Sequence, residues 1–281
     1  MSTYTKHFPT FSIITITLNN LTGLQKTYKS IEKQSFTDVQ WIVIDGNSTD
    51  DTVDFLRQRR TNTRSDKIPF SFISEEDHGI YDAMNKGIAQ ANGHYLLFLN
   101  AGDELANENT LKTLYPLTKK KPSFIYGDAL EPQTNRKKPI YKASRRYKDL
   151  AWGMITHHQA MLYRRHTIRD FKLRYSLRYK IASDYDFTVR FLLKAKKIVY
   201  INKPICIFEQ GGISQQNATL GRKEQYIIRE NLDMIPQPKN LWILCVQTIS
   251  WRLKNAAPAF YRGLKSIILK VIDSKNKDTT S

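Results

Sequence analysis

The chain has 281 residues, an apolar share of 41% and a formal net charge of +18. This length suffices for one large domain or one domain with an appendage, and the apolar share excludes a disordered chain. So large a positive charge favours a polyanionic partner, which is nucleic acid, anionic lipid or a phosphorylated substrate.

The N-terminal residues contain no long apolar segment of the kind found in secretory signals. No window approaches the roughly 20 apolar residues of a membrane-spanning helix. Cys206 and Cys245 form no metal-binding or disulfide pattern, which fits a reducing compartment. These features together predict a cytoplasmic protein.

The first half of the chain alternates apolar strands with helices. Strands are predicted at residues 11–18, 39–44, 68–74 and 95–99, and helices at residues 21–34, 52–58 and 81–92. This alternation predicts an α/β fold with a mostly parallel central sheet flanked by helices.

Polar side chains follow each of these four strands. They are Asn19, Asp45, Asp77 and, after the fourth strand, Asn100 with Asp103. Because ligands of such sheets bind beyond the carboxyl ends of the strands, we expect these side chains to line one pocket.

The second half is less regular. Residues 123–130 and 157–165 are predicted as strands, residues 196–209 as a pair of strands, and residues 183–195 as an amphipathic helix. A flexible segment follows at residues 211–217. No internal repeat or low-complexity tract is present.

The C-terminal residues form a basic, amphipathic segment. Helices are predicted at residues 241–255 and 259–272. From Lys239 onward the chain has eight Lys and Arg residues and only two acidic residues, Asp273 and Asp278. Residues 236–281 are therefore predicted to be a basic helical tail that binds an anionic membrane surface.

Four segments carry a family resemblance: SIITITLNN, WIVIDGNSTDDT, the stretch from Ser74 to Leu105, and IASDYDF. Together they resemble the family-two inverting glycosyltransferases of the GT-A nucleotide-diphosphosugar transferase fold. The similarity covers residues 11–215 and is nearest to bacterial exopolysaccharide enzymes of the colanic acid type. It implies sugar transfer from a nucleotide-diphosphosugar, with a divalent cation at the diphosphate.

The resemblance implies that the ends of the first two strands bind the nucleotide. Asp45 corresponds to a carboxylate that accepts a hydrogen bond from the base, a role that suits a group with only acceptor oxygens when ionised. Thr17 and Asn19 correspond to a loop that wraps the nucleotide. The structural alternatives are a turn for Asp45 and ordinary strand-end polarity for Thr17 and Asn19.

Three further residues correspond to positions near the nucleoside and the diphosphate: Asp77, Asn85 and Lys86. Lys86 also fits a solvated helix face, and this alternative stays open.

The turn at residues 100–103 departs from the family pattern. The family has an Asp-x-Asp type turn here, whereas this chain has Asn100, Ala101, Gly102 and Asp103. The resemblance implies that Asn100 binds the ribose and that Asp103 binds Mn²⁺ or Mg²⁺, which prefer oxygen ligands. With one carboxylate instead of two, metal binding should be weak without the nucleotide. Gly102 permits either a tight turn or close approach of the diphosphate.

The family places its catalytic base in a Glu-Asp pair at the start of a helix in the second half. Here the pair reads Ser183-Asp184, so Asp184 is the candidate base and Asp186 is the weaker choice. Capping of the helix by Ser183 or Asp184 is the structural alternative, and it is compatible with catalysis.

Two further positions correspond to the acceptor side of the family's site. His158 lies where relatives have a histidine and a glutamine near the sugars, although a structural histidine is equally consistent. Gly211 and Gly212 correspond to a loop that closes over substrates, or they form an ordinary turn.

The sequence therefore predicts an inverting, metal-dependent glycosyltransferase that uses a UDP- or GDP-sugar. Its acceptor is predicted to be a glycan, or a lipid-linked glycan of a growing bacterial surface polysaccharide. The transferase domain is predicted at residues 1–235, with a nucleotide-binding half up to about residue 115 and an acceptor half at 116–235. The enzyme is predicted to lie on the inner face of the cytoplasmic membrane.

Three rival functions were weighed against this prediction. A non-catalytic nucleotide-sugar-binding protein is one, because both acidic motifs have lost a carboxylate. A basic nucleic-acid-binding protein is another, but the chain lacks the interleaved basic and aromatic motifs of the common modules, so no nucleic acid is expected. A Rossmann oxidoreductase lacks support, because the first strand leads into TLNNLTG and not into a G-x-G-x-x-G fingerprint.

Overall fold

The computed structural model describes residues 7–61, 67–133 and 136–257. The chain divides into two compact units, residues 1–216 and 217–281. The end of the transferase domain at residue 235 stays a prediction. The division of that domain into a nucleotide-binding half and an acceptor half near residue 115 stays a prediction as well. The predicted tail helix at residues 259–272 lies outside the described residues.

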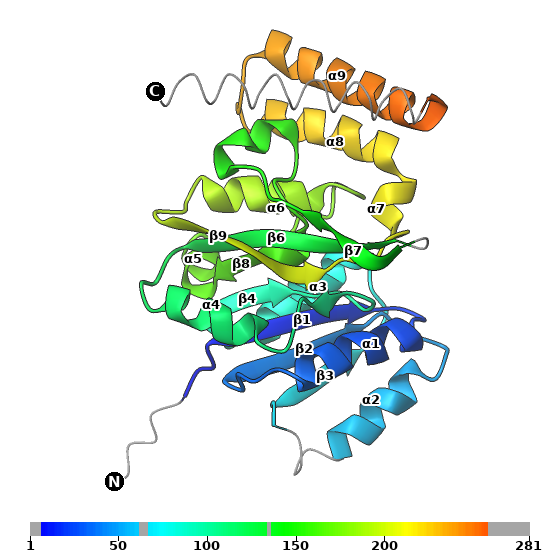
Figure 1. Ribbon diagram of the computed structural model, residues 1–281, viewed down its shortest axis with the longest axis vertical. Coiled ribbons are helices and arrows are strands. Elements are labelled where there is room, and N and C mark those ends of the chain that lie inside the picture. Colours follow the sequence, from blue (N-terminus) through cyan, green and yellow to red (C-terminus); the bar gives the residue numbers. More distant parts are fainter. Residues whose placement is uncertain (1–6, 62–66, 134–135, 258–281) are drawn as a thin grey trace. The chain divides into compact units, whose positions relative to one another are not determined.

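The first unit begins with four strands in parallel register (Figure 1). Its first elements are β1 (Phe11–Thr17), α1 (Leu21–Glu32), β2 (Val39–Asp45), α2 (Thr52–Thr61), β3 (Phe70–Ser74), α3 (Ile80–Gln90) and β4 (Tyr95–Phe98). All seven residues of β1 are buried, as expected for a strand covered on both faces. Parallel pairing joins β3 to β2, β2 to β1 and β1 to β4, which confirms the predicted α/β alternation.

Helices cover both faces of this part of the sheet. On one face α1 and α2 pack over a core that includes Leu24, Trp41 and Leu56. On the other face α3 packs so closely on β1 that a Cβ at Gly87 would come within 2.3 Å of Ile14. The chain first adds β2 and β3 on one side of β1 and then adds β4 on the other side, as the order β3-β2-β1-β4 shows. Ligands of α/β sheets bind at such a switch in strand order.

Over its described residues, the second half of this unit extends the same sheet with four antiparallel pairs and one parallel pair, β6 with β9. Its elements are β5 (Glu104–Leu105), α4 (Thr110–Thr118), β6 (Phe124–Gln133), β7 (Arg136–Lys142), η1 (Tyr147–Trp152), η2 (His158–Ala160), β8 (Met161–Arg164), α5 (Arg165–Asp170), α6 (Ser183–Leu192), β9 (Ile198–Ile207) and α7 (Ile213–Gln216). Among the described residues the full order is β3-β2-β1-β4-β8-β6-β9-β5, with β7 on β6. The sheet is therefore mixed overall.

Two predicted strands differ from the structure. Residues 196–209 form the single strand β9, whose pairing with β6 shifts register near Gly127 and Asp128, so the expected pair of strands is wrong. The polar start of residues 157–165 folds instead as the 3-10 turn η2, and only Met161–Arg164 is a strand.

The second unit consists, in its described part, of α8 (Ala218–Asn231) and α9 (Gln237–Ala256). The two helices pack as a pair around the buried Ile228 and Ile243. Arg229 is fully buried, and its Nε donates to Asn240 Oδ1 over 2.6 Å. The predicted helix at residues 241–255 is confirmed within α9.

Candidate active site

The carboxyl ends of β1, β2 and β3 lie side by side. Thr17 is in register with Asp45, and Asp45 is in register with Ser74. The turn after β4 adjoins them, because the Ala101 N–H donates to the Ile16 carbonyl over 3.1 Å. The ends of these strands therefore meet at one edge of the sheet, while a pocket lined by their polar side chains stays a prediction.

Asp45 is fully buried, and hydrogen bonds within the protein occupy its carboxylate. Oδ1 accepts from the Ser48 hydroxyl (2.5 Å), while Oδ2 accepts from the Ser48 N–H (3.0 Å) and the Ser74 hydroxyl (2.7 Å). Ser48 and Ser74, but not Asp45, line a surface pocket that α2 completes with Arg57 and Arg60. Asp45 thus fixes two serines at a pocket wall.

Asn19 holds the two loops after β1 and β2 together. It has a positive φ of 49°, a conformation that asparagine tolerates better than most residues. Its side-chain oxygen accepts from the Thr49 N–H over 2.7 Å, and its own N–H donates to the Ser48 hydroxyl. By contrast, Thr17 Oγ1 is buried without a hydrogen-bond partner among the described residues.

Lys86 projects from α3 into an acidic cluster at the end of β3. Its ammonium lies 2.6 Å from Asp77, 3.0 Å from Glu75 and 3.6 Å from Asp82. Burial opposes the charge, but the hydrogen bonds to Asp77 and Glu75 raise the pKa of Lys86 above its ordinary value. Lys86 is therefore held by carboxylates and is not on a freely solvated face.

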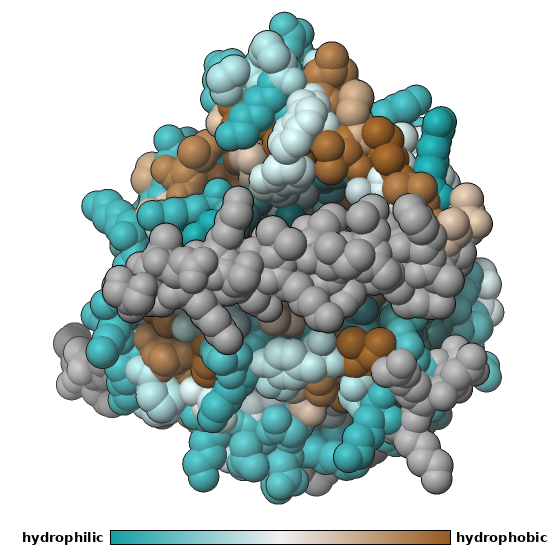
Figure 2. All heavy atoms as spheres, turned by 45° about the horizontal axis from the view of Figure 1, so that its top comes forward, coloured by the Kyte–Doolittle hydropathy of each residue, from teal (hydrophilic) through white to brown (hydrophobic). Residues whose placement is uncertain are grey.

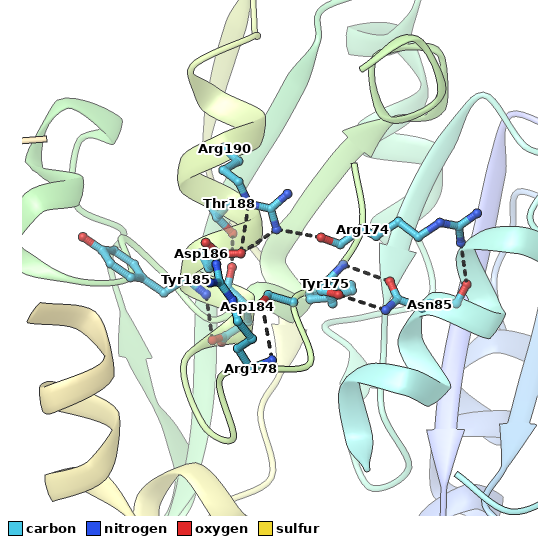
Figure 3. Close-up of polar contacts among 10 residues, drawn as sticks. Asn85, Arg174, Tyr175, Arg178, Asp184, Tyr185, Asp186, Thr188 and Arg190 are labelled. Carbon is cyan, nitrogen blue, oxygen red and sulfur yellow. Dashed lines mark hydrogen bonds and ion pairs between the residues drawn. The ribbon is translucent and has the colours of Figure 1, made fainter. Parts of the chain in front are cut away.

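Asn85 joins α3 to the segment that precedes α6 (Figure 3). Its Nδ2 donates to the Tyr175 carbonyl (3.0 Å), and its Oδ1 accepts from the Tyr175 N–H (2.9 Å). Both polar atoms of the Asn85 amide are therefore used to connect α3 with the main chain at Tyr175.

The turn from Asn100 to Asp103 is anchored on α1. The Thr27 hydroxyl, which is buried, donates to the Asp103 carbonyl (2.7 Å) and accepts from the Gly102 N–H (3.0 Å). Gly102 has a φ of 104°, a left-handed conformation that favours glycine. The Asn100 side-chain oxygen is buried and has no partner in the described part of the chain.

Asp103 is 4% exposed and accepts hydrogen bonds from two distant segments. Gln159 Nε2 donates to Oδ2 over 2.6 Å, and the Glu209 N–H donates to Oδ1 over 2.9 Å. Burial raises the pKa of Asp103 to about 7, an effect that these two hydrogen bonds oppose. This carboxyl group therefore gains or loses its charge near neutral pH.

Asp184 lies in the first turn of α6, next to His158. Its Oδ2 is 3.9 Å from His158 Nδ1, and its Oδ1 accepts from the Tyr185 N–H. Burial lowers the pKa of His158 to about 3, with a smaller contribution from His157, so the imidazole is neutral at physiological pH. Its Nε2 has no hydrogen-bond partner among the described residues.

Consecutive residues of η2 link the two acids. His158 adjoins Asp184, and Gln159 holds Asp103. The fold thereby brings the candidate base and the candidate metal ligand to one short turn. Neither the sequence spacing nor the motifs specify that η2 supplies this link.

Asp186, the weaker candidate base, has a structural partner (Figure 3). Arg190 Nε and Nη2 reach its Oδ2 over 2.9 and 2.5 Å, and Arg190 also donates to the Arg174 carbonyl. Asp186 is 5% exposed, so this i,i+4 pair is largely shielded. Its geometry supports a role in holding α6.

Gly211 and Gly212 lie in an exposed loop before α7. Gly211 has a φ of 95°, and its N–H donates to the Gln215 side chain over 2.8 Å. A Cβ at either glycine would meet nothing within 4 Å. The role of this loop in closing over substrates stays a prediction.

Glu209, in the same loop, is a site residue that the sequence analysis missed. Its N–H binds Asp103, and its carboxylate lies against Gly102. A lone glutamate before a Gly-Gly pair gives no periodic or motif signal. Only the pairing of β9 with β5 brings it to the turn after β4.

Several side chains at the strand ends, η2 and α6 keep a buried polar atom without a hydrogen-bond partner. Within the described residues they include Thr17 Oγ1, Asn100 Oδ1, His158 Nε2, Gln159 Oε1 and Ser183 Oγ. Buried polar groups are nearly always hydrogen-bonded, so such atoms call for a further partner, either water or a polar ligand.

The same set of atoms fits a hard divalent cation shared with a diphosphate. Asp103 supplies a carboxylate, and Asn100 and Gln159 supply uncommitted amide oxygens, which are the donors that Mg²⁺ and Mn²⁺ prefer. No group of three or more His, Cys, Asp or Glu side chains in the described segments could hold a metal by itself. This donor set therefore fits a cation that takes further ligands from a bound phosphate.

The sequence profile of glycosyl transferase family 2 matches residues 12–195. The chain belongs to this family. A PGL/p-HBAD biosynthesis glycosyltransferase of Mycobacterium bovis is 35% identical to it over 185 residues, which cover 65% of this chain and 69% of the relative. A GalNAc(5)-diNAcBac-PP-undecaprenol beta-1,3-glucosyltransferase of Campylobacter jejuni is 32% identical over 122 residues, which cover 43% of this chain and 38% of that enzyme.

Solved structures place the glycosyltransferase in the GT-A fold. Staphylococcus aureus TarS, in complex with UDP-GlcNAc, aligns with a TM-score of 0.65 at 19% identity, over 87% of this chain and 72% of that one. A Pyrobaculum calidifontis mannosyltransferase, in complex with GDP-Man and Mn²⁺, aligns with a TM-score of 0.64 at 14% identity, over 98% and 84%. At these identities the similarity shows the fold, which confirms the fold class predicted from the sequence.

Proposed function

We propose that this glycosyltransferase moves a sugar from a nucleotide-diphosphosugar to an acceptor hydroxyl with inversion at the anomeric carbon. One observation carries the proposal: neighbouring residues of η2 reach both acids, because Gln159 donates to Asp103 and the neutral His158 lies 3.9 Å from Asp184. Both residues keep a buried polar atom without a partner among the described residues. One carboxylate can then serve the acceptor while the other serves the diphosphate.

Asp184 is the proposed general base. It accepts the proton of the acceptor hydroxyl as the new bond to the anomeric carbon forms and the bond to the diphosphate oxygen breaks. His158, kept neutral by burial, does not neutralise Asp184 with a positive charge. Its unpartnered Nε2 is available to a sugar hydroxyl.

Asp103, with Asn100 and Gln159, is proposed to hold the divalent cation and the adjoining diphosphate. A bound Mn²⁺ or Mg²⁺ would stabilise the negative charge that develops on the leaving nucleotide. Because Asp103 titrates near neutral pH, its readiness to bind a cation increases as pH rises through about 7.

The nucleotide is proposed to lie over the ends of β1 and β2. Thr17 and Asn100 offer polar atoms without partners, which suits direct contact. The internal bonds of Asp45, Asn19 and Asn85 favour a supporting role instead, in which these residues fix the loops and serines around the ligand. Asp77 and Lys86 offer paired charges beside this edge.

The acceptor is proposed to be a lipid-linked glycan on the inner face of the cytoplasmic membrane. The name of the Campylobacter relative specifies an undecaprenol-linked acceptor, which supports this class of substrate. No helix among residues 7–61, 67–133 and 136–257 has both the length and the apolarity to span a bilayer. The similarity to colanic acid enzymes in particular stays a prediction.

The described part of the basic tail supports contact with an anionic membrane surface. α9 carries Lys239, Arg252 and Lys254 and no acidic residue. Leu241, Trp242 and Ile249 are each more than half exposed, and Trp242 and Ile249 share one helical face with Cys245. Apolar side chains gather in patches, coloured brown, on the face drawn in Figure 2.

A vesicle assay tests this contact. The double variant Trp242→Glu with Ile249→Glu should no longer sediment with phosphatidylglycerol vesicles, because both changes place acids on the apolar face of a basic helix. Leu193→Glu, on an exposed apolar side chain of the first unit, is the matched control and should sediment like the wild type. Equal sedimentation of all three proteins would exclude α9 as the membrane contact.

The donor and the metal site are tested together by thermal shift. The protein is titrated with UDP, GDP and their sugars, each with and without MnCl₂. We expect one nucleotide to raise the melting temperature in a manganese-dependent way, and Asp103→Ala to abolish that dependence. No shift with any nucleotide would contradict the proposed donor class.

A non-catalytic nucleotide-sugar-binding protein is the second candidate. The observation in its favour is that Asn100 and Ser183 stand where the family carries acids. A thermal shift without any sugar transfer or donor hydrolysis, across acceptors extracted from bacterial membranes, would favour this candidate over the enzyme.

A further inference from the structure

Glu209 lies directly over the turn that carries Asp103. An ideal Cβ built on Gly102 would come within 1.8 Å of Glu209 Oε2. The Glu209 N–H also donates to Asp103 Oδ1 over 2.9 Å. One residue of the β9 loop therefore contacts the candidate metal ligand through its main chain and covers the turn with its carboxylate.

The neighbouring positive charge does not fix this carboxylate firmly. Lys26 Nζ is 3.7 Å from Glu209 Oε1 and 3.4 Å from Glu104 Oε1, and the Glu209 side chain is 47% exposed. An exposed pair at such distances contributes little to stability, so Glu209 can exchange this partner for another cation at small cost.

An independent observation at the same place comes from Gln159, which is 2% exposed. Its Nε2 holds Asp103 Oδ2, while Oε1 of the same amide has no partner among the described residues. Because one planar amide carries both atoms, this uncommitted oxygen is bonded to the same carbon as the nitrogen that holds Asp103. A buried amide oxygen and two carboxylates form an oxygen donor set for a hard cation.

We infer that Glu209 is the second carboxylate ligand of the divalent cation, in place of the acid that the turn lacks at Asn100. The inference rests on the proposed function, because it assigns a ligand at the same metal site. Asp103 supplies the first carboxylate from the end of β4, and Glu209 supplies the second from the loop after β9. The site then spans two elements, so cation binding also fixes the loop that contains Gly211 and Gly212.

Glu104 provides a matched control. It is acidic, it pairs with the same Lys26, and it is one residue from Asp103, but it does not lie over Gly102. Glu104→Gln and Glu209→Gln therefore remove equal charge from almost the same place. A difference between these variants in Mn²⁺ affinity therefore reports a direct contact with the cation and not a long-range electrostatic effect.

Binding of Mn²⁺ is measured by electron paramagnetic resonance on the full chain, with Mn²⁺ alone and with UDP or GDP added. We expect Glu209→Gln to weaken Mn²⁺ binding by about tenfold or more, as for loss of one of two carboxylate ligands. Glu104→Gln should change it by less than about twofold. Melting temperatures within a few degrees of the wild type confirm that each variant is folded.

Asp103→Asn separates failure of the inference from failure of the proposed function. Loss of Mn²⁺ binding in Asp103→Asn, with wild-type binding in Glu209→Gln, would overturn the inference and leave the metal site in place. Equal weakening in Glu209→Gln and Glu104→Gln would overturn it as well, because the effect would then be long-range. Unchanged Mn²⁺ binding in Asp103→Asn would overturn the metal site itself.

Discussion

Two regions of the first unit treat buried polar groups in opposite ways. At the ends of β2 and β3, Asp45 is fully buried but receives three hydrogen bonds from Ser48 and Ser74. Around η2, the buried Gln159 and His158 each keep one polar atom without a partner in the described chain. In the first region the protein itself supplies every hydrogen-bond partner of the buried carboxylate. In the second region the two buried side chains need partners from outside the described chain.

The difference separates scaffold from site. A satisfied buried network rigidifies the segments that it joins, while an unsatisfied one costs free energy that a bound ligand or an ordered water recovers. By this criterion we propose that the centre of the chemistry lies near Asp103 and Asp184, and that the nucleotide half mainly fixes its loops. Substitutions on the two sides should therefore differ: those at satisfied residues should lower stability, and those at Asp103 and Asp184 should alter metal binding or turnover.

The largest effect is expected at Asp184. Asp184→Asn removes the proposed base, so the rate of sugar transfer should fall by about 10² to 10⁴-fold while nucleotide affinity stays within about twofold. Transfer is measured with labelled donor, and affinity by calorimetry. Asp186→Asn is the control, since it breaks the pair with Arg190 and should lower stability more than turnover. Similar losses of rate in both variants would contradict the assignment.

Asp103 should make stability depend on pH. Its folded pKa of about 7 exceeds the ordinary 3.8, so between pH 4 and 7 the folded protein keeps a proton that the unfolded chain has lost. The contribution of Asp103 to the free energy of unfolding therefore falls as pH rises through this window, whereas buried His158, with its lowered pKa, contributes in the opposite direction up to about pH 6.5. In EDTA, Asp103→Asn should gain about 4 kcal/mol relative to the wild type between pH 4 and pH 8.

Urea denaturation at several pH values measures this difference. Gln159 allows the substitution, because its unpartnered Oε1 can turn to accept from the new amide. A difference in stability between wild type and Asp103→Asn that stays constant from pH 4 to 8 would show that the pKa of Asp103 is not raised in the folded state.

A smaller loss of stability is expected at Asp45. In Asp45→Asn one side-chain oxygen becomes a donor that faces donors from Ser48 and Ser74, so the free energy of unfolding should fall by about 2 kcal/mol. Ser74→Ala, which removes one hydrogen bond, should cost about 1 kcal/mol. If Asp45→Asn keeps wild-type stability and loses nucleotide affinity, then the carboxylate binds the base directly, and the division drawn above is wrong there.

The smallest effect is expected at Asn85. Asn85→Ala removes two hydrogen bonds to the main chain of Tyr175, and we expect a loss of about 1 kcal/mol in the free energy of unfolding. Nucleotide affinity should not change by more than about twofold, because both ends of the amide face protein. A tenfold loss of affinity at unchanged stability would restore the direct nucleotide contact that the resemblance implies.

The sequence was a good guide where one local pattern decides the outcome. The β-branched, apolar run at residues 11–18 predicted a strand covered on both faces, and the fully buried β1 confirms it. It failed where partners come from far along the chain. Residues 196–209 form one strand because β6 pairs along their whole length, and no local signal reveals that partner. The roles of Asn85 and Glu209 depend equally on contacts about 90 and 106 residues away.

The sequence by itself determined the family, the alternation of strands and helices, and the identity of the acids at the strand ends, because periodicity and motifs are properties of neighbouring residues. Only the tertiary structure decided which of those acids are satisfied and which are not. Hydrogen bonding and burial depend on segments that meet through sheet pairing, and η2, β9 and the turn after β4 meet only in the folded chain.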